Sequence, residues 1–316
     1  MPSTALVPTR VAAAQLTSTA DPAANFAAAA RLAASAVAAG AATLFLPEAF
    51  AFMGESPADT LAAAQPLGGP RLASYRTLAA STGLWLSLGG FGEAGAPPAP
   101  GSATPRVWNT HVVVDPAGSI VAAYRKVHLF DAEGLTESAA TSPGSGPPVV
   151  VAGTPLGPLG LAVCFDLRFA GFFDELQYGG SGGEDGDGDG KEPSYAARVI
   201  AVPAAFTVQT GGPHWEVLLR ARAVETQAAV VAAAQAGRHN GKRASYGHAC
   251  VVDAWGTVLA RVGGAAPDDE EALHGEGLAV ADLGDASVEA VRRRLPLGAA
   301  RAKGRAAMRT ASRACD

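Results

Sequence analysis

The sequence has few cysteines, and they follow no pattern. Its 316 residues include only Cys164, Cys250 and Cys315, which are far apart and never in the C-x-x-C spacing. An odd number of scattered cysteines argues against a disulfide framework and against a zinc site. We therefore expect reduced thiols, each of which is either a small buried side chain or a thiolate with a local reason for its reactivity.

A basic surplus and long apolar runs are also missing. The formal net charge is −5 at pH 7, so the charge balance does not draw the chain to phosphates or anionic lipid. No stretch of about 18 strongly apolar residues is present, and the N-terminus lacks a charged segment followed by a Leu-rich one. We expect no nucleic-acid partner, no membrane role, a small-molecule substrate and a cytoplasmic location.

What is present is a globular composition, with 48% apolar and 17% charged residues. A chain of this length and composition predicts a single domain with one large core. We expect that domain over residues 10–285, after an N-terminal extension over 1–9 and before a C-terminal tail or dimer arm over 286–316. Residues 179–194 are rich in Gly and Asp, cannot bury a core, and are expected to be a low-complexity loop insertion.

This insertion contains the first half of a calcium-loop pattern, with Asp185, Asp187, Asp189 and Gly190 at suitable spacing. Position twelve of the loop is Ala196, where calcium needs a bidentate Glu, and no helical pattern leads into it. We therefore expect no metal site here.

Short apolar runs alternate with helical stretches along the chain. Strands are expected over 10–16, 43–46, 84–89, 109–114, 119–124, 159–163, 199–202 and 230–234, with a hairpin over 249–261. Helices are expected over 25–39, 71–81 and 215–227. This alternation predicts a layered α/β sandwich.

Three polar residues each end an apolar strand: Glu48, Lys126 and Cys164. In layered α/β folds, strand ends are where side chains converge on a rigidly held site. A thiol is only slightly ionised at neutral pH, so a nucleophilic Cys164 needs a base and a positive charge nearby. Glu48, its pKa raised by partial burial, is the candidate base, and Lys126 would hold the oxyanion together with the backbone N–H of Phe165.

Each of these residues also has an ordinary interpretation. Cys164 is equally compatible with a packed core thiol, Glu48 with a solvated turn residue and Lys126 with a surface cation. A Cys–His pair is the competing catalytic arrangement, and six histidines are available for it, of which His128 lies two residues after the lysine. Nothing in the sequence marks one of them as a partner, and a satisfied core or loop histidine is the alternative for His128.

At these residues the sequence resembles the nitrilase, or carbon–nitrogen hydrolase, family, in which a Glu, a Lys and a Cys occur in this order. The motifs lie at 46–50 (LPEAF), 124–131 (YRKVHLFD) and 160–169 (GLAVCFDLRF). The resemblance implies a single-domain, four-layer-forming α-β-β-α sandwich, amide hydrolysis through a cysteine thioester, a homodimer and no cofactor. It also implies that Glu137 is a second glutamate that positions the lysine and the substrate.

Within the family, residues 213–227 and 237–248 are most similar to members that hydrolyse the 2-oxoglutaramyl amide bond of deaminated glutathione. That metabolite-repair reaction releases 2-oxoglutarate and Cys-Gly. Arg168 is the candidate partner of a substrate carboxylate, because a guanidinium offers two parallel donors, and a salt bridge with Asp166 or Glu175 is its alternative. Two other functions remain open: an ω-amidase acting on 2-oxoglutaramate or 2-oxosuccinamate, and a non-catalytic interaction protein on the same fold.

Overall fold

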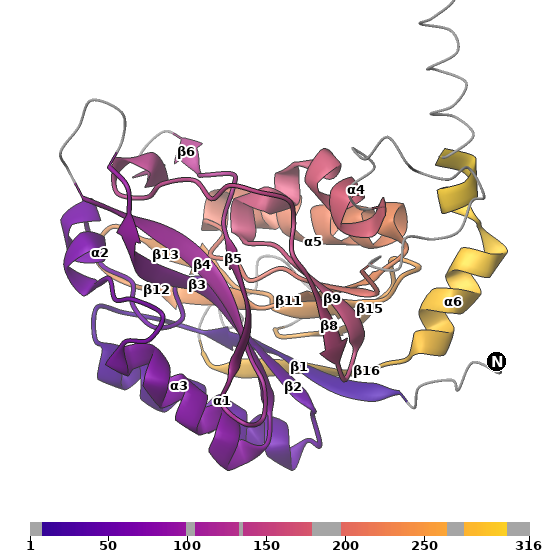
Figure 1. The fold of residues 1–316 in the computed structure, drawn as a ribbon, viewed down its shortest axis with the longest axis horizontal. Coiled ribbons are helices and arrows are strands. Elements are labelled where there is room, and N and C mark those ends of the chain that lie inside the picture. The colour runs from indigo at the N-terminus through magenta and orange to yellow at the C-terminus, as the bar shows by residue number, and fades with distance from the viewer. Residues whose placement is uncertain (1–7, 99–104, 133–134, 179–196, 264–274, 302–316) are drawn as a thin grey trace, which may run out of the picture.

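Two β-sheets lie face to face at the centre of the protein, with helices on both outer faces (Figure 1). The structure is a computed structural model that describes residues 8–98, 105–132, 135–178, 197–263 and 275–301. The insertion at 179–194 and its calcium-like pattern lie outside the described residues. Among the described residues, no helix is both long enough and apolar enough to cross a membrane.

The first sheet has eight strands in the order β13-β12-β1-β2-β3-β4-β5, with β16 paired to β1 as well. Strands β1, β2 and β3 are parallel, and β3, β4 and β5 form an antiparallel meander. The bounds are β1 Thr9–Leu16, β2 Thr43–Leu46, β3 Trp85–Ala96, β4 Arg106–Val114, β5 Ile120–Arg125, β12 Ala234–Arg238, β13 Ala244–Tyr246 and β16 Gly277–Leu283.

The second sheet has six strands in the order β15-β14-β11-β10-β9-β8. Strands β9, β10 and β11 are parallel to one another at its centre. The bounds are β8 Val150–Thr154, β9 Gly157–Leu161, β10 Val199–Ala201, β11 Ala229–Ala232, β14 Cys250–Val252 and β15 Val258–Arg261. A small third sheet joins β6 Asp131–Ala132 to β7 Leu135–Thr136.

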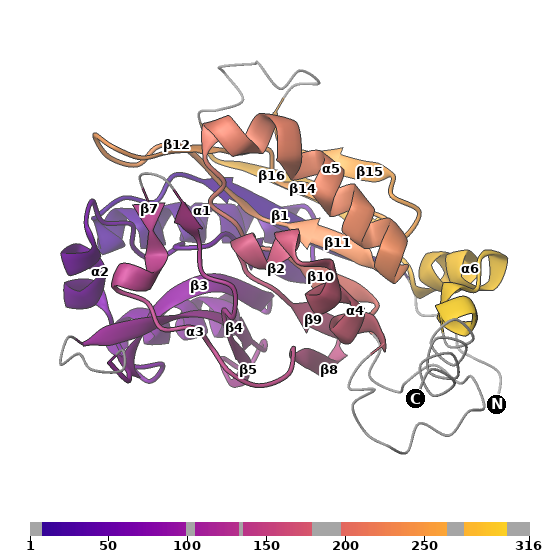
Figure 2. The ribbon, with the colours of Figure 1, turned by 90° about the horizontal axis from the view of Figure 1, so that it is seen from above.

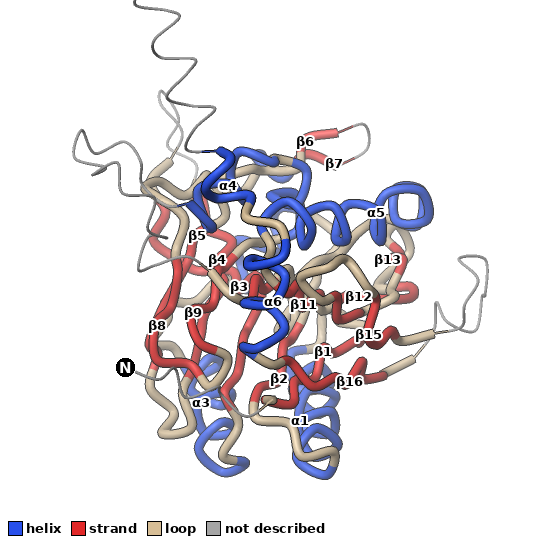
Figure 3. Tube along the Cα trace, turned by 90° about the vertical axis from the view of Figure 1, so that its right-hand side faces the viewer, coloured by secondary structure: helices blue, strands red, loops and turns tan. Residues whose placement is uncertain are grey.

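The helices form the outer layers, as the views in Figures 2 and 3 show. Helices α1 (Pro22–Ala38) and α3 (Pro70–Thr82) cover the first sheet, whereas α4 (Ala170–Tyr178) and α5 (Val208–Thr226) cover the second. Helix α2 (Pro57–Ala63), helix α6 (Asp285–Arg294) and two 3₁₀ turns, η1 (Glu137–Ala139) and η2 (Cys164–Arg168), complete the structure. The predicted α-β-β-α sandwich is confirmed.

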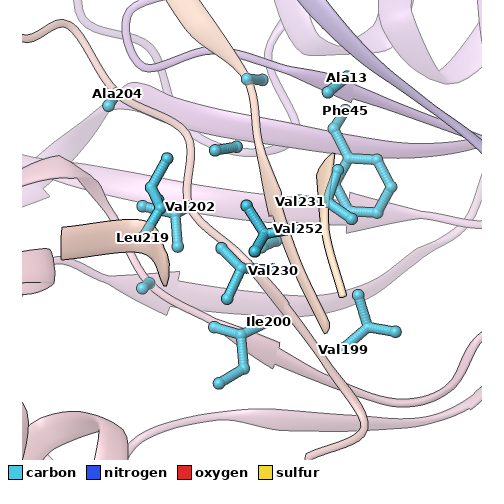
Figure 4. Packing of buried hydrophobic residues seen from close by; sticks show 14 of the residues in the cluster. Ala13, Phe45, Val199, Ile200, Val202, Ala204, Leu219, Val230, Val231 and Val252 are labelled. Atoms are coloured by element: carbon cyan, nitrogen blue, oxygen red, sulfur yellow. The ribbon is translucent and has the colours of Figure 1, made fainter. Parts of the chain in front are cut away.

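Both faces of the central strands are buried, and successive residues alternate between two apolar clusters. In β1, Val11 and Ala13 pack toward the second sheet, while Ala12 and Ala14 pack toward α1 and α3. Figure 4 shows Ala13 and Phe45 beside the valines of the second sheet. Because both of their faces are covered, the central strands β2, β10 and β11 have almost entirely apolar sequences.

Strands β6, β7, β8, β12, β13 and β16 and helices α2 and α4 have no counterpart in the sequence-based expectation, and two further helices differ from it. Helix α5 begins at Val208, not at residue 215, because the Thr207 hydroxyl caps its first turn and the helix continues through Pro213. Helix α6 extends the packed structure to Arg294, into the range 286–316 that we assigned to a tail. Its Arg292 is buried and donates to the backbone oxygens of Gln227 and Ala197.

Candidate active site

The three predicted residues each follow a strand, and the two sheets bring them together. Glu48 comes two residues after β2, Lys126 directly after β5, and Cys164 three residues after β9. All three are buried, with 6%, 1% and 8% of their surfaces exposed, respectively. The expectations of a solvated turn glutamate and a surface lysine are therefore wrong, because the facing sheets enclose both strand ends.

Lys126 is held between two glutamates. Its Nζ lies 3.0 Å from Oε1 of Glu48 and 2.7 Å from Oε2 of Glu137. The Nδ2 of Asn109, on β4, donates to the same two carboxylates at 2.9 Å each, and the backbone N–H of Phe130 donates to Glu137 at 2.8 Å. The site is thus a closed network in which one ammonium and one amide bridge two carboxylates.

The Cys164 thiol lies near the Glu48 carboxylate, which raises its pKa, and near the backbone of Ala205, which lowers its pKa. Its own backbone N–H donates to the Pro203 oxygen at 2.8 Å, and its φ of 45° lies in the left-handed region. A residue with a side chain adopts this conformation only where the surrounding structure enforces it. The chain turns here from β9 into η2, and this turn directs the sulfur toward Glu48.

The backbone around Glu48 is similarly constrained. The Gln235 side chain donates to the Glu48 backbone oxygen at 2.9 Å, and Ala49 has a φ of 57°. Gly90, with a φ of +68°, lies so close that a Cβ there would be 2.8 Å from both Asn109 Oδ1 and Glu48 Cγ. Only glycine fits this position, and its close approach fixes where the glutamate can lie.

The charges of the site favour an ionised glutamate. Burial raises the pKa of Glu48, but the Lys126 ammonium, the Cys164 hydrogen bond and the Arg243 guanidinium together lower that pKa below its ordinary value. This corrects the expectation that partial burial would raise it. The sequence does not show how close the two cations come, and their attraction outweighs the desolvation.

The other two groups of the site are a neutral thiol, on Cys164, and a charged ammonium, on Lys126. Burial and the neighbouring Glu48 charge raise the pKa of Cys164 well above its ordinary value, although Lys126 opposes this. Burial lowers the pKa of Lys126, but the charges of Glu137 and Glu48 raise it by more than burial lowers it. The net shift is therefore upward. The resting site therefore holds a thiol beside a carboxylate, a charge state in which the proton leaves sulfur only as the sulfur reacts.

Comparison with known proteins identifies the family. The family model described as carbon–nitrogen hydrolase matches residues 10–173 and 194–293. The chain belongs to this family. The predicted family is therefore confirmed, as is the prediction of a hydrolase that acts on carbon–nitrogen bonds in amides.

Three relatives illustrate the similarity. The chain is 44% identical over 292 residues to the human protein named deaminated glutathione amidase, covering 91% of this chain and 80% of that one. The crystal structure of NitFhit from C. elegans matches with a TM-score of 0.73 and 35% identity, over 92% of this chain and 64% of that one. A variant of the amidase from Nesterenkonia sp. AN1, with the acetamide moiety of fluoroacetamide added at its active-site cysteine, matches with a TM-score of 0.69 and 26% identity, over 93% and 96% of the two chains.

In this carbon–nitrogen hydrolase, Arg168 does not form the predicted salt bridge with Asp166 or Glu175 among the described residues. Its guanidinium contacts His214 Nδ1 at 3.2 Å and lies over the rings of Phe165 and Phe206, at 5.8 and 5.3 Å from their centroids. Phe165 directly follows the nucleophile candidate, so Arg168 is placed near the site and has no carboxylate partner in the part of the chain that the structure describes.

The histidines do not support a Cys–His pair. Among the described residues, none of them hydrogen-bonds to Cys164. His128 contacts Asp166 Oδ1 at 2.7 Å, and His111 bonds to Ser87 and to the Ala162 backbone oxygen. Burial lowers the pKa of His111 to about 4, so it is neutral at physiological pH.

Two residues of the site, Asn109 and Arg243, carry no signal in the sequence. Asn109 lies inside β4 and joins Glu48 to Glu137, and Arg243 follows the turn between β12 and β13 and lowers the Glu48 pKa. Neither ends a strand, so neither has a local signal. In the described parts of the chain, no group of three or more His, Cys, Asp or Glu side chains is arranged to hold a metal ion.

Proposed function

We propose that this protein is an amidase that hydrolyses the 2-oxoglutaramyl amide bond of deaminated glutathione and releases 2-oxoglutarate and Cys-Gly. The observation that carries the proposal is the buried network in which the Lys126 ammonium lies 3.0 Å from the Glu48 carboxylate and 2.7 Å from that of Glu137, with the Cys164 thiol near the Glu48 carboxylate. The similarity to relatives with this name, over 91% of the chain, supports the substrate.

In the first half of the reaction, the thiol proton passes to Glu48 while the Cys164 sulfur attacks the amide carbon. The oxyanion that forms is stabilised by the Lys126 ammonium and the backbone N–H of Phe165. Glu48 then gives its proton to the leaving nitrogen, so Cys-Gly departs with a neutral amine and the 2-oxoglutaryl group stays on sulfur as a thioester. The low pKa of Glu48 keeps it ready to accept a proton, and attack and proton transfer are therefore coupled.

In the second half, Glu48 takes a proton from water as the water attacks the thioester carbon. The oxyanion again lies against Lys126, and its collapse expels the thiolate, which recovers the proton from Glu48. 2-Oxoglutarate leaves, and the starting charges are restored. In this scheme Glu137 and Asn109 neither contact the sulfur nor transfer a proton. They hold Lys126 and Glu48 in place.

Substrate recognition requires a partner for a carboxylate, and Arg168 is the candidate that we assign. Its guanidinium lies over the ring of Phe165, the residue after the nucleophile, and has no carboxylate partner among the described residues. A guanidinium binds a carboxylate through two parallel hydrogen bonds, so Arg168→Lys should weaken binding almost as much as Arg168→Gln.

The test compares kcat/KM for 2-oxoglutaramyl-Cys-Gly with kcat/KM for 2-oxoglutaramate, using the purified protein and Cys164→Ala as the inactive control. A preference for the peptide-like amide supports the proposal, whereas a preference for the small amide makes the protein an ω-amidase. Mass spectrometry after iodoacetamide separates both from a non-catalytic interaction protein. In that last case, a folded protein would turn over neither amide and would form no rapid adduct at Cys164.

We also propose a homodimer formed through the exposed face of α5. Val217 and Val224 on this helix are 61% and 46% exposed, and Trp255, 50% exposed, directly precedes Gly256, which lies close to Val224. Exposed apolar side chains that lie near one another are typical of an interface. Val217→Glu with Val224→Glu should give a monomer by light scattering. We also propose a cytoplasmic location, with which the two free cysteines Cys164 and Cys250 are compatible.

A further inference from the structure

One buried carboxylate near the site has no part in the reaction described above. Asp166 lies two residues after Cys164, in the η2 turn, and none of its surface is exposed. A buried carboxylate is costly unless hydrogen bonds compensate for the lost water. The partners of Asp166 therefore indicate why the chain keeps a charge at this point.

Four donors occupy both oxygens of Asp166. Its Oδ1 accepts from the backbone N–H of His128 at 3.2 Å and from the Nδ1 of the same histidine at 2.7 Å. Its Oδ2 accepts from the Tyr124 hydroxyl and from the Val163 backbone N–H, both at 2.9 Å. An ionised carboxylate has about four acceptor positions, so this one is filled by protein groups alone.

These donors flank the candidate catalytic residues. Tyr124 comes two residues before Lys126 and His128 two residues after it, while Val163 directly precedes Cys164. Lys126 follows a strand of the first sheet and Cys164 a strand of the second. One carboxylate thus connects the segment that carries the lysine with the segment that carries the thiol, across the space between the sheets.

The His128 ring is fixed on its other side as well. It stacks on the Phe169 ring with centroids 3.7 Å apart and planes 10° apart, and it meets the Phe172 ring edge-on at 5.8 Å. Phe169 and Phe172 follow η2 and therefore belong to the segment that carries Cys164. The lysine segment is therefore clamped by both a hydrogen-bonded and a stacked contact.

We propose that Asp166 is a positioning residue that sets the distance between the Cys164 sulfur and the Lys126 ammonium, through Tyr124 and His128. The inference rests on the proposed function, in which this distance matters because the sulfur and the ammonium act on the same substrate carbonyl. The oxyanion forms on the carbon that is bonded to sulfur, and it must meet the ammonium there. A displacement of about 1 Å between such groups can lower turnover about 100-fold.

Asparagine cannot replace Asp166 in this arrangement, although it has the same shape. Each oxygen accepts two hydrogen bonds, so an amide nitrogen in either position would face two donors. Asp166→Asn is therefore expected to lose both stability and activity, and it does not separate the two effects. Substitution of the donors removes one contact at a time.

The experiment uses two matched pairs. Tyr124→Phe removes one donor, and Tyr75→Phe is its control, because the buried Tyr75 hydroxyl has no hydrogen-bond partner among the described residues. His128→Leu removes the ring donor, whereas His128→Asn keeps an N–H near the position of Nδ1. For each variant, kcat, KM, the melting temperature and the second-order rate of Cys164 labelling by iodoacetamide are measured.

We expect kcat to fall at least 10-fold in Tyr124→Phe and His128→Leu with KM within about two-fold, and the labelling rate to fall with it. Tyr75→Phe should match the wild type, and His128→Asn should recover most of the loss in kcat. Wild-type kcat and labelling in Tyr124→Phe and His128→Leu, with only their melting temperatures lowered, would overturn the proposal and leave Asp166 as a structural residue. The labelling rate decides the matter even if the wild type hydrolyses neither amide, a result that would count against the proposed function alone.

Discussion

The ammonium of Lys126 lies 2.7 Å from the Glu137 carboxylate and 3.0 Å from the Glu48 carboxylate, so it is closer to Glu137. All three side chains are largely buried. Without the cation that both of them contact, the carboxylates of Glu48 and Glu137 would repel each other. The lysine therefore has a structural role in addition to its proposed contact with the oxyanion, and loss of activity in a lysine variant has two causes that must be separated.

We predict that Lys126→Met destabilises the protein by about 3–5 kcal/mol, because it leaves two buried carboxylates without a positive partner. Adding Glu137→Gln should restore part of this stability, since one of the two charges is then removed, but should restore no turnover. Urea unfolding monitored by circular dichroism measures the stability of both variants. Equal unfolding free energies for the single and double variants would show that repulsion between the glutamates is negligible.

Much of the site could be predicted from the sequence because three of its polar residues come shortly after apolar strands. Glu48, Lys126 and Cys164 stand out for this reason. Glu137 follows only a two-residue strand, and its position was expected from the family resemblance alone. Asn109 occupies a polar position within β4, which is indistinguishable from any other until β4 is placed beside β3 and β5.

The fold was predictable to a similar extent, and the electrostatics were not. Apolar runs located strands β1 to β5, β9 to β11 and the β14–β15 hairpin, but not β8, β12, β13 or β16. Helix α6 was missed because its apolar residues are few and Arg292 is buried by backbone contacts from distant segments. The direction of the Glu48 pKa was wrong in the sequence analysis. It depends on Lys126 and Arg243, which lie 78 and 195 residues away in the chain and come together only in the folded protein.

The low pKa of Glu48 predicts how activity falls in acid. Because Glu48 must be ionised to accept the thiol proton, the acid limb of kcat/KM should lie below the ordinary glutamate pKa of about 4.3. Arg243→Gln removes one of the charges that lower this pKa, so the limb should move to higher pH. The profile is measured where circular dichroism shows a folded protein, with Lys242→Gln, the neighbouring cation, as control. An unmoved limb in Arg243→Gln would mean that this guanidinium does not act on Glu48.

The stability of the folded protein should also depend on the ionisation of Glu48. Its folded pKa lies below the unfolded one, so Glu48 contributes stability above the unfolded pKa of about 4.3 that is lost as the pH falls through the folded value. Glu48→Gln should therefore flatten this part of the curve of unfolding free energy against pH. A curve that keeps its acid slope in Glu48→Gln would assign the slope to other carboxylates.

Gly90 allows a steric test of how tightly the glutamate is held. Gly90→Ala places a methyl 2.8 Å from Glu48 Cγ and Asn109 Oδ1 at a φ of +68°, so we expect a loss of more than about 1 kcal/mol in stability and a fall in kcat of about 100-fold. Gly92→Ala, on the same strand, is the control, because nothing lies within 4 Å of its added Cβ. Thermal unfolding and steady-state kinetics measure both. Similar kinetics for the two variants would show that Glu48 can move aside without cost.

The last prediction concerns the amide of Asn109, whose Nδ2 donates to Glu48 and Glu137 at 2.9 Å while its Oδ1 has no hydrogen-bond partner in the described parts of the chain. Asn109→Asp keeps the shape but turns the shared donor into a third carboxylate around one ammonium. Like charges raise carboxylate pKa values in the folded state above those in the unfolded state, so the variant should lose about 3–5 kcal/mol at pH 7 and progressively less as the pH falls and the cluster binds a proton. Asn109→Leu removes the donor without adding charge, and its loss should vary little over the same range. Urea unfolding of both variants at pH 5, 6, 7 and 8 measures the difference, and a loss in Asn109→Asp that is constant with pH would mean that the three carboxylates do not share one electrostatic site.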